Sequence, residues 1–397
     1  MMPSAVGVVD NASNVPPAYL QPVFEPDFGT EIERISDPTA MGVDLSHRRF
    51  IRNAYAKVQP WNADESLLLL GYNWGGVLLD GKTYQFIRTV WQPNQARWSN
   101  TDPHILFGVL GNRLVKQDYS NIRDRSAPNP PYQMIREFSE FDSISIGEGE
   151  GSFSLDDRWV ALQARKGEQT FLVLHNLKTN RVVQTDLNGG WPDNVSVSPT
   201  GKWVIVEWKT SGTERNQGIE VYRPWLTRLT FARQLSPYST HFDVGLDTNR
   251  KEVIVLRDPA VWENGIVKIS VDTGKMTKVY WGDGSNQPSW SGSHVSFQNS
   301  QRPGWVYWSD YAPSRQAGLP GFQQVYAIKL DGSRTVERFA YSRPGEDIDV
   351  YGTQPMAVPN RSGTRVLFGS TWNGAAGAVV NSYVASKLDV VAPVRTS

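Results

Sequence analysis

The chain repeats one pattern of polar and apolar residues along most of its length. Each copy has a turn rich in Asp, Asn, Gly, Ser or Pro, followed by three or four β-forming residues. Asp and Asn bond to their own backbone, Gly accepts positive φ, and Pro fixes φ at the first turn position. The pattern therefore predicts a series of β-hairpins. The seven copies lie at 59–71, 100–109, 152–162, 196–208, 244–256, 288–297 and 357–370.

The spacing of these copies indicates how the hairpins assemble. Successive turns lie on average about fifty residues apart, within the length range of a four-stranded propeller blade. Further strand–turn–strand patterns fall between the copies, at 170–185, 265–281 and 323–341. We therefore predict an all-β fold, a seven-bladed β-propeller with four-stranded antiparallel blades. A pair of β-sandwiches is the alternative fold, but sandwiches have no repeat of this length.

The propeller is expected to occupy residues 41–388. Residues 1–40 are predicted to be an N-terminal extension that docks in part, and residues 389–397 a C-terminal tail. A length of 397 residues does not require two domains, because a propeller can form one long unit. Most of the 15 tryptophans are expected to pack between twisted blades.

Composition and motifs exclude several classes of function. The chain has 40 basic and 40 acidic residues and no long basic run, so we expect no nucleic-acid partner. It has no cysteine, which excludes disulfides, thiolate nucleophiles and cysteine-bound zinc. Neither a Gly-x-Ser-x-Gly elbow nor a His-Glu-x-x-His motif occurs, so serine hydrolase and zincin functions have no support. The glycine-rich stretch 147–154 lacks a following Lys-Ser/Thr and carries two glutamates, so it is predicted to be a loop.

The sequence also bears on localisation. The N-terminus has no basic segment followed by an apolar core, so we expect no secretory signal. No window approaches the about 18 apolar residues of a membrane helix, which predicts a soluble protein without a membrane span. A chain without cysteine suits either redox environment, and the compartment stays open.

Three stretches in the second half of the chain carry a resemblance to a known family. They read THFDVGLD at 240–247, SHVSFQNSQRPGWVYWS at 293–309 and TQPMAVPNRSGTRVLFGS at 353–370. Their order resembles that of the oligogalacturonate-lyase-like propellers, which are polysaccharide lyase family 22 and its relatives. The SPTGKWVIV unit at 198–206 resembles the blades of TolB-like propellers. The resemblance implies a central funnel that cleaves uronate-containing oligosaccharides by β-elimination.

The resemblance also implies roles for single residues. His241 matches a histidine that the family places near the reacting sugar, and it is our catalytic candidate. His294 and Gln354 match two ligands of the family's divalent cation, which would be Mn or Ca. The family pattern continues Gln-x-x-His-x-His, whereas this chain has Ala357 and Pro359 at the two histidine positions. Neither side chain has a lone pair, so we expect that metal site to be lost or rebuilt.

The chemistry of β-elimination suggests further candidates near these histidines. Removal of a proton α to a carboxylate needs a positive group at that carboxylate as well as a base. Arg302 follows His294 by one turn and is our second catalytic candidate, because arginine pairs well with carboxylates. Asp243 lies two residues after His241, on the same face of the expected strand, and is a candidate for substrate binding. The alternative for each residue is a structural role within the fold.

The densest basic cluster of the chain lies beside His47. Its members Arg48 and Arg49 are candidates for binding an acidic sugar or an acidic partner surface, because arginine binds carboxylates with two hydrogen bonds. The alternative is a solvated loop whose charges pair with nearby carboxylates.

Two functions remain open at this point. The first is a carbohydrate-active propeller that binds or cleaves an acidic, uronate-containing oligosaccharide. The second is a non-catalytic propeller that serves as a structural or binding module of a protein assembly, such as a virion or a cell-surface complex. The replaced ligand positions favour the second function, and the ordered family stretches favour the first.

Overall fold

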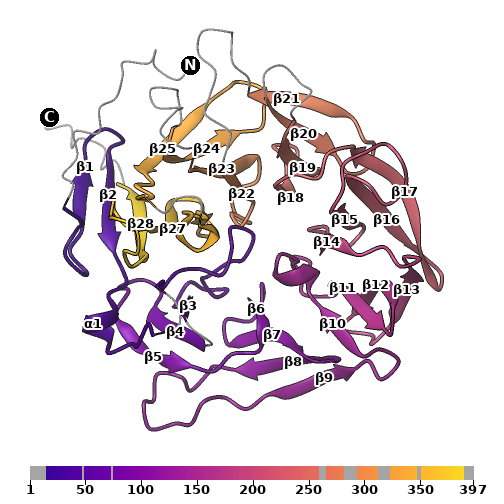
Figure 1. The fold of residues 1–397 in the computed structure, drawn as a ribbon, viewed down its shortest axis with the longest axis horizontal. Helices are drawn as coiled ribbons and strands as arrows, with labels where there is room; N and C mark the ends of the chain where they lie inside the picture. Colours follow the sequence, from indigo (N-terminus) through magenta and orange to yellow (C-terminus); the bar gives the residue numbers. More distant parts are fainter. Residues whose placement is uncertain are drawn as a thin grey trace, which may run out of the picture.

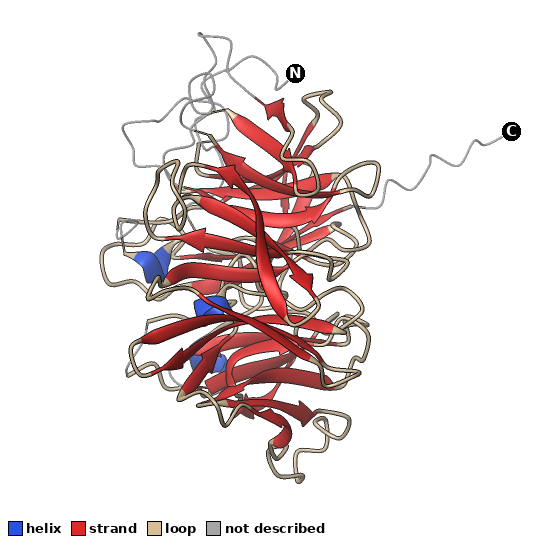
Figure 2. Cartoon of the chain, turned by 90° about the vertical axis from the view of Figure 1, so that its right-hand side faces the viewer, coloured by secondary structure: helices blue, strands red, loops and turns tan. Residues whose placement is uncertain are grey.

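The computed structural model describes residues 15–46, 49–72, 75–258, 265–280, 293–311, 322–346 and 350–388. Within these ranges, seven antiparallel sheets stand around one axis, and in the sheets between the first and the last, the first strand lies nearest that axis (Figure 1). Strands make up almost all of the regular structure, as the side view shows (Figure 2). The prediction of an all-β, seven-bladed propeller is therefore confirmed.

Five of the seven sheets have four strands, and each strand pairs with the next one along the chain. One of them comprises β6 (Asn94–Trp98), β7 (Ile105–Leu110), β8 (Arg113–Asp118) and β9 (Gln133–Glu137). The next sheet comprises β10 (Ser143–Ser145), β11 (Trp159–Lys166), β12 (Gln169–Asn176) and β13 (Val182–Asp186). A third sheet comprises β14 (Pro192–Val197), β15 (Val204–Trp208), β16 (Ile219–Trp225) and β17 (Arg228–Ser236). A fourth comprises β18 (Phe242–Leu246), β19 (Glu252–Arg257), β20 (Ile266–Ser270) and β21 (Met276–Tyr280). The fifth comprises β22 (Ser293–Ser296), β23 (Trp305–Asp310), β24 (Gln324–Lys329) and β25 (Val336–Tyr341).

The first sheet has three strands, β3 (Leu67–Tyr72), β4 (Gly75–Asp80) and β5 (Phe86–Val90). At the place of a fourth, innermost strand, two isolated antiparallel bridges join Trp61 to Leu68 and Arg52 to Gly71. The residues before Trp61 enter the central channel instead of forming a regular strand. This sheet therefore departs from the four-stranded pattern of the other blades.

The last sheet has five strands and joins the two ends of the described chain. It contains β26 (Val358–Pro359), β27 (Arg365–Ser370) and β28 (Asn381–Lys387), with β2 (Thr30–Arg34) and β1 (Val23–Glu25) added at its outer edge. The β1 and β2 strands come from the residues predicted as an N-terminal extension. A buried ion pair of 3.0 Å between Arg343 and Glu25 further ties β1 to the end of the neighbouring β22–β25 sheet. These contacts close the ring.

Helical structure is short and lies in the connections. The one-turn helix α1 (Pro38–Met41) starts where the side chain of Asp37 accepts a hydrogen bond from the N–H of Ala40, and it ends at Gly42 in the left-handed conformation. Two 3-10 turns, η1 (Gly147–Gly149) and η3 (Tyr351–Thr353), lie beside the channel. Within the described ranges, no helix has the length and apolar character needed to cross a bilayer.

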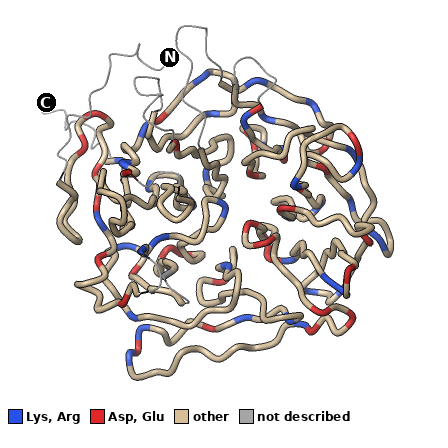
Figure 3. The backbone as a smooth tube through the Cα atoms, in the orientation of Figure 1, with Lys and Arg blue, Asp and Glu red and all other residues tan. Residues whose placement is uncertain are grey.

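The core lies between neighbouring sheets. One apolar cluster, for example, combines Ile205 and Val221 of the β14–β17 sheet with Phe242 and Ile254 of the β18–β21 sheet. The second strand of a sheet is packed between its neighbours, and strands such as β15 and β19 therefore read as nearly continuous apolar runs. Acidic and basic residues are interspersed around the ring (Figure 3).

The approach of neighbouring sheets is closest near the axis. A Cβ atom on Gly245 of β18 would lie 2.2 Å from the ring of Phe297, which follows β22 in the next sheet. Glycine is therefore required at this position, because a side chain there would push the two inner strands apart. This close packing holds the channel-lining residues of the two sheets in a defined relationship.

Candidate functional site

A segment of the chain from 51 to 62 enters the central channel. Every residue from 55 to 62 is buried, and Figure 1 shows this part of the chain reaching from the first sheet toward the middle of the ring. Lys57 Nζ lies 2.8 Å from Glu150 Oε2, which belongs to the loop after β10. Gln59 Nε2 donates to the carbonyl oxygens of Gln298 and Pro359, at 3.0 and 3.1 Å. We call residues 51–62 the channel segment.

Three of the residues predicted from the sequence come together beside the channel segment. The rings of His241 and His294 lie 4.7 Å apart between centroids. His294 Nε2 lies 2.8 Å from Gln354 Oε1. All three residues precede or begin the innermost strand of their sheet, so the ring brings the same ends of three strands together. The convergence of His241, His294 and Gln354 follows from the propeller geometry.

Hydrogen bonds determine where each imidazole carries its proton. His241 Nδ1 lies 2.7 Å from the carbonyl oxygen of Ser293, and a carbonyl oxygen can only accept. His241 therefore has its lone pair on Nε2, which makes no hydrogen bond to a described residue. With the Gln354 oxygen as acceptor, His294 is protonated on Nε2, and its buried Nδ1 carries a lone pair without a partner in the described ranges.

Both histidines are held in the neutral form at neutral pH. Burial is the main cause that lowers the pKa of His241, and the positive charge of Lys57 lowers it further. Burial also lowers the pKa of His294 well below its ordinary value, followed by the effect of His241. A neutral imidazole with an exposed lone pair can act as a general base.

Tyrosine rings surround the side chain of His294. Tyr55 meets the imidazole edge to face, with 5.4 Å between the ring centroids. Tyr311 lies 5.1 Å away and Tyr351 lies 6.2 Å away on the same measure. Tyr55 and Tyr351 also stack on each other at 6.3 Å. These aromatic contacts restrict the imidazole to one orientation and exclude water from it.

Lys57 is a buried ammonium group among three carboxyl groups. Its side chain is 3% exposed, and its Nζ lies 4.4 Å above the ring of Phe242. Burial opposes the positive charge, but Glu150, Glu207 and Asp243 outweigh this effect and raise the pKa of Lys57. Burial in turn raises the pKa of Glu207 to about 8, against the opposing effect of Lys57. Glu207 is therefore mostly protonated at neutral pH.

Asp243, predicted to bind substrate, is bonded inside the protein. Its carboxylate accepts hydrogen bonds from the backbone N–H of Phe297 at 2.6 Å and from that of Val244 at 2.8 Å. Burial raises the pKa of Asp243 to about 6, and Lys57 acts in the opposite direction. The Asp243 carboxylate thus links two inner strands and stabilises Lys57, and it is 5% exposed.

The structure does not bring Arg302 to the histidines. Arg302 follows the end of β22, whereas His294 lies near the start of that strand. Its guanidinium forms two hydrogen bonds with the Glu337 carboxylate, at 2.7 and 2.8 Å, and lies 4.0 Å over the ring of Trp305. A turn at this end of the strand therefore places Arg302 between the β22–β25 sheet and the last sheet.

The two remaining predicted residues belong to the basic cluster. Arg48 lies outside the described residues, as does its neighbour His47. Arg49 is exposed, and its carbonyl oxygen accepts a hydrogen bond of 2.8 Å from the N–H of Val380. Its guanidinium lies beside Gly377, so the structure places Arg49 against the connection between β27 and β28.

The donor set does not fit the divalent cation that the resemblance implies. Within the described ranges, no group of three or more His, Asp or Glu side chains is arranged to hold a metal ion. Ala357 and Pro359 provide no side-chain donor at the two substituted positions. His294 and Gln354, the two matching residues, are hydrogen bonded to each other. We therefore derive no chemical step through a metal ion.

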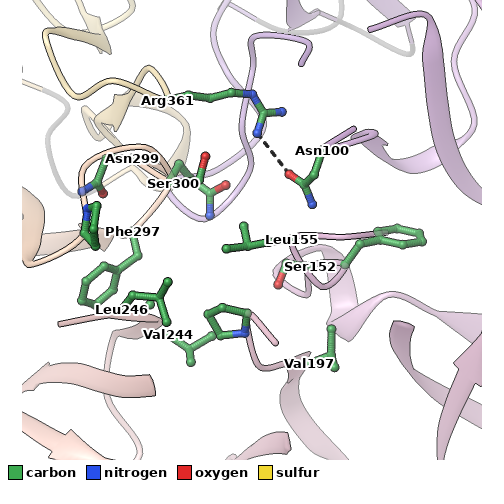
Figure 4. Close-up of a pocket in the computed structure, with 15 residues that line it drawn as sticks. Asn100, Ser152, Leu155, Val197, Val244, Leu246, Phe297, Asn299, Ser300 and Arg361 are labelled. Carbon is green, nitrogen blue, oxygen red and sulfur yellow. Dashed lines mark hydrogen bonds between the residues drawn. The ribbon is translucent and has the colours of Figure 1, made fainter. Parts of the chain in front are cut away.

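Two pockets open near the channel. The first, of about 320 Å³, adjoins the tyrosines and is lined by Tyr55, Gln92, Glu150 and Tyr351, among others. The second is lined by residues at or beyond the ends of the inner strands and therefore lies at the other mouth of the channel. Figure 4 shows it, with Arg361 and Asn100 on one side and Val244, Leu246 and Phe297 on the other.

Sequence reasoning missed the buried charges of this site. Lys57 lies in the apolar and aromatic stretch AYAKVQPW at 54–61, and a single lysine in such a stretch is a signal of a buried charge. Glu150 belongs to the glycine-rich loop that was predicted without a functional role. Glu207 lies on β15 and would pass for an ordinary strand residue. Only the ring places these side chains next to each other.

Comparison with known proteins bears on the fold. No protein-family model and no curated protein matches the sequence. Among solved structures, an oligogalacturonate lyase from Vibrio parahaemolyticus matches with a TM-score of 0.62 and 13% sequence identity, over 92% of this chain and 96% of that chain. A chain from a mitotic checkpoint complex matches with a TM-score of 0.49 and 10% identity, over 86% of this chain and 93% of that one. The first of these matches shows that this chain has the overall fold of an oligogalacturonate lyase.

Proposed function

We propose that the channel end around His241, His294 and Gln354 binds an oligosaccharide that contains a uronate residue, and that His241 acts as the base of a β-elimination. The observation that carries this proposal is the lone pair of His241 Nε2. Nδ1 is fixed by the Ser293 carbonyl, the ring is neutral, and the side chain is only partly buried. The likeness in fold to an oligogalacturonate lyase supports the same class of ligand.

The β-elimination needs few groups besides His241 and water. His241 Nε2 takes the proton from C5 of the uronate, the bond between C4 and its bridging oxygen breaks, and a double bond forms between C4 and C5. The departing oxygen takes a proton from water, and His241 returns its proton to solvent. Atoms and charges balance without an oxidant or a second substrate.

Positive charge near the histidines favours a carboxylate ligand. Lys57 lowers the pKa of His241, and both Arg52 and Lys57 contribute to the lowered pKa of His294. The same potential attracts the carboxylate of a uronate and stabilises the negative charge that develops when C5 loses its proton. Glu150 and Asp193 oppose this effect at His241, so the attraction is moderate.

An absorbance assay tests this proposal. The protein is incubated with oligogalacturonate or with an ulvan-type polymer, with and without divalent cations, and the unsaturated product is followed in the ultraviolet. We expect activity in the wild type and a loss of at least about a hundredfold in His241→Ala. His104→Ala removes an exposed histidine and should leave the activity unchanged. No product from any uronate polymer under these conditions would rule out the lyase.

A second candidate function is a binding module without catalysis. Ala357 and Pro359 remove two ligands from the family pattern, and the channel segment fills the channel with buried side chains. A propeller with these features can retain its fold without catalysis and bind other proteins in a larger assembly, because fold alone does not determine function. Uronate binding without product, or stable association with other proteins of its source, would favour this candidate.

A further inference from the structure

The pocket of about 320 Å³ has room for one sugar ring. It lies between the channel segment, the strands β3 and β6, and the loop that includes η1. An apolar cavity of about 150 Å³ holds a benzene molecule, so a cavity of this size accommodates a six-membered ring with its hydroxyl groups. Tyr55 and Tyr351 line this pocket and also contact His294, so it adjoins the histidine pair. We call it the side pocket.

Several of the hydrogen-bond donors that line the side pocket are already used. The Arg97 guanidinium donates to the carbonyl oxygens of Gly149, Gly151 and Ala96, at 2.6, 2.7 and 2.9 Å. Trp98 Nε1 donates to the carbonyl oxygen of Pro60 at 3.1 Å. The side-chain amide groups of Gln59 and Gln95 also donate to protein oxygens. A ligand with many acceptors would therefore find few partners here.

Acceptors in the same pocket remain available. Gln92 contributes a side-chain amide to the lining, although its Oε1 atom is itself buried. The Glu148 carboxylate makes no hydrogen bond to a described residue, and Glu148 adopts a φ of 50°, which is uncommon for a residue with a side chain. Glu150 uses only one oxygen for Lys57. A ligand that donates several hydrogen bonds matches this lining.

The aromatic residues of the pocket suit the faces of a sugar ring. Tyr55, Trp98 and Tyr351 contribute rings to the lining. Tyr351 is 53% exposed and stands at the entrance, whereas Tyr55 and Trp98 are buried. Flat apolar surface next to acceptor oxygens complements a pyranose, which has C–H groups on its faces and hydroxyl donors at its edge.

Charge indicates that this sugar is neutral. Glu148 and Glu150 bring two negative charges to the pocket, while Arg97 and the Lys57 bound to Glu150 bring two positive ones. These charges balance, so neither an anion nor a cation gains from entering the pocket. A charged sugar would lose hydration on entering this pocket without gaining net attraction, and a uronate would also meet the carboxylates of Glu148 and Glu150.

We propose that the side pocket is a subsite for a neutral sugar residue, so that the ligand is a mixed polymer in which a neutral sugar neighbours the uronate. The position of the uronate rests on the proposed function, whereas the binding of a neutral sugar does not. A homopolymer of uronate would place a carboxylate against Glu148 and Glu150. The mixed polymer avoids this repulsion and uses the free acceptors.

Ligand-detected NMR titrations of the full chain test this inference. The probes are methyl glucoside and methyl rhamnoside as neutral sugars, galacturonate as the anion and glucosamine as the cation. We expect the neutral glycosides to bind at least fivefold more tightly than the two charged probes. Tyr351→Ala and Gln92→Leu should each weaken neutral binding by about fivefold or more, because they remove a ring face and a polar side chain from the lining.

Two carboxylate variants serve as a matched pair. Glu148→Gln should keep neutral binding within about threefold and strengthen galacturonate binding, because repulsion is removed. Glu168→Gln, in the exposed turn between β11 and β12, should change neither. His241→Ala should retain neutral binding, so loss of lyase activity and loss of the subsite can be distinguished. Preference for galacturonate or glucosamine, or neutral binding that is unaffected by Tyr351→Ala and Gln92→Leu, would overturn the inference.

Discussion

His294 Nε2 donates a hydrogen bond to Gln354 Oε1 across 2.8 Å, although 60 positions separate the two residues in the chain. The bond joins the β22–β25 sheet to the segment before β26 in the last sheet. It also determines which nitrogen of His294 carries the proton. One contact between two blades thus orients an imidazole at the candidate site.

Loss of this contact should destabilise the protein. Gln354→Leu removes the acceptor and leaves the buried N–H of His294 without a partner. We expect the free energy of unfolding to fall by about 1–3 kcal/mol, measured by urea denaturation. Gln133→Leu, at an exposed position of β9, is the control and should change it by less than about 0.5 kcal/mol. Equal stabilities of the two variants would show that another group accepts the hydrogen bond of the His294 N–H.

Replacement of Lys57 should have a larger effect. Lys57→Met keeps most of the side-chain volume but leaves the carboxylates of Glu150 and Asp243 without their common cation. A buried pair that loses one partner is destabilised by about 3–5 kcal/mol. Chemical denaturation should show a loss of this order, whereas Lys166→Met, at an exposed end of β11, should be near neutral. A Lys57→Met protein as stable as the wild type would contradict the buried-charge arrangement.

The pH dependence of stability should reveal the protonated state of Glu207. Burial raises its pKa from 4.5 to about 8, so the folded protein binds more protons than the unfolded chain between these pH values. This contribution to stability is complete below about pH 4.5 and is lost as the pH rises through about 8. Glu207→Gln should therefore reduce the fall in the free energy of unfolding between pH 5 and pH 8. Parallel pH profiles for the two proteins would contradict the raised pKa.

Closure of the ring should depend on Glu25. The Glu25 carboxylate lies 3.0 Å from Nη2 of Arg343, and both side chains are at most 4% exposed. Glu25→Ala leaves a buried guanidinium without this carboxylate, so we expect the midpoint of thermal unfolding to fall by several degrees. Glu31→Ala changes an exposed residue of β2 and should leave the midpoint almost unchanged. Similar midpoints for both variants would show that β1 does not contribute to closure.

Much of the fold was predictable because its signals are local. The turns before β11 and β15 contain Asp, Gly or Pro at positions that need them, and the apolar runs after them are long enough for one strand each. The order of His241, His294 and Gln354 along the chain also indicated a shared site, through the family resemblance. Arg302 was predicted to lie near His294 because the two residues are close in sequence. That closeness does not reveal that His294 lies near the start of β22 and Arg302 lies beyond its end.

The sequence by itself determined that the chain folds into seven similar sheets, because turn chemistry and alternating apolar residues act over a few positions. Only the tertiary structure decided that Lys57 is buried, that β1 and β2 complete the last sheet, and that Glu207 keeps its proton. These features depend on side chains that are far apart in sequence and meet only when the ring closes. The energies of the two buried groups come from the removal of charge from water, and that of β1 and β2 comes from pairing with the distant strand β28, and no short stretch of sequence encodes either.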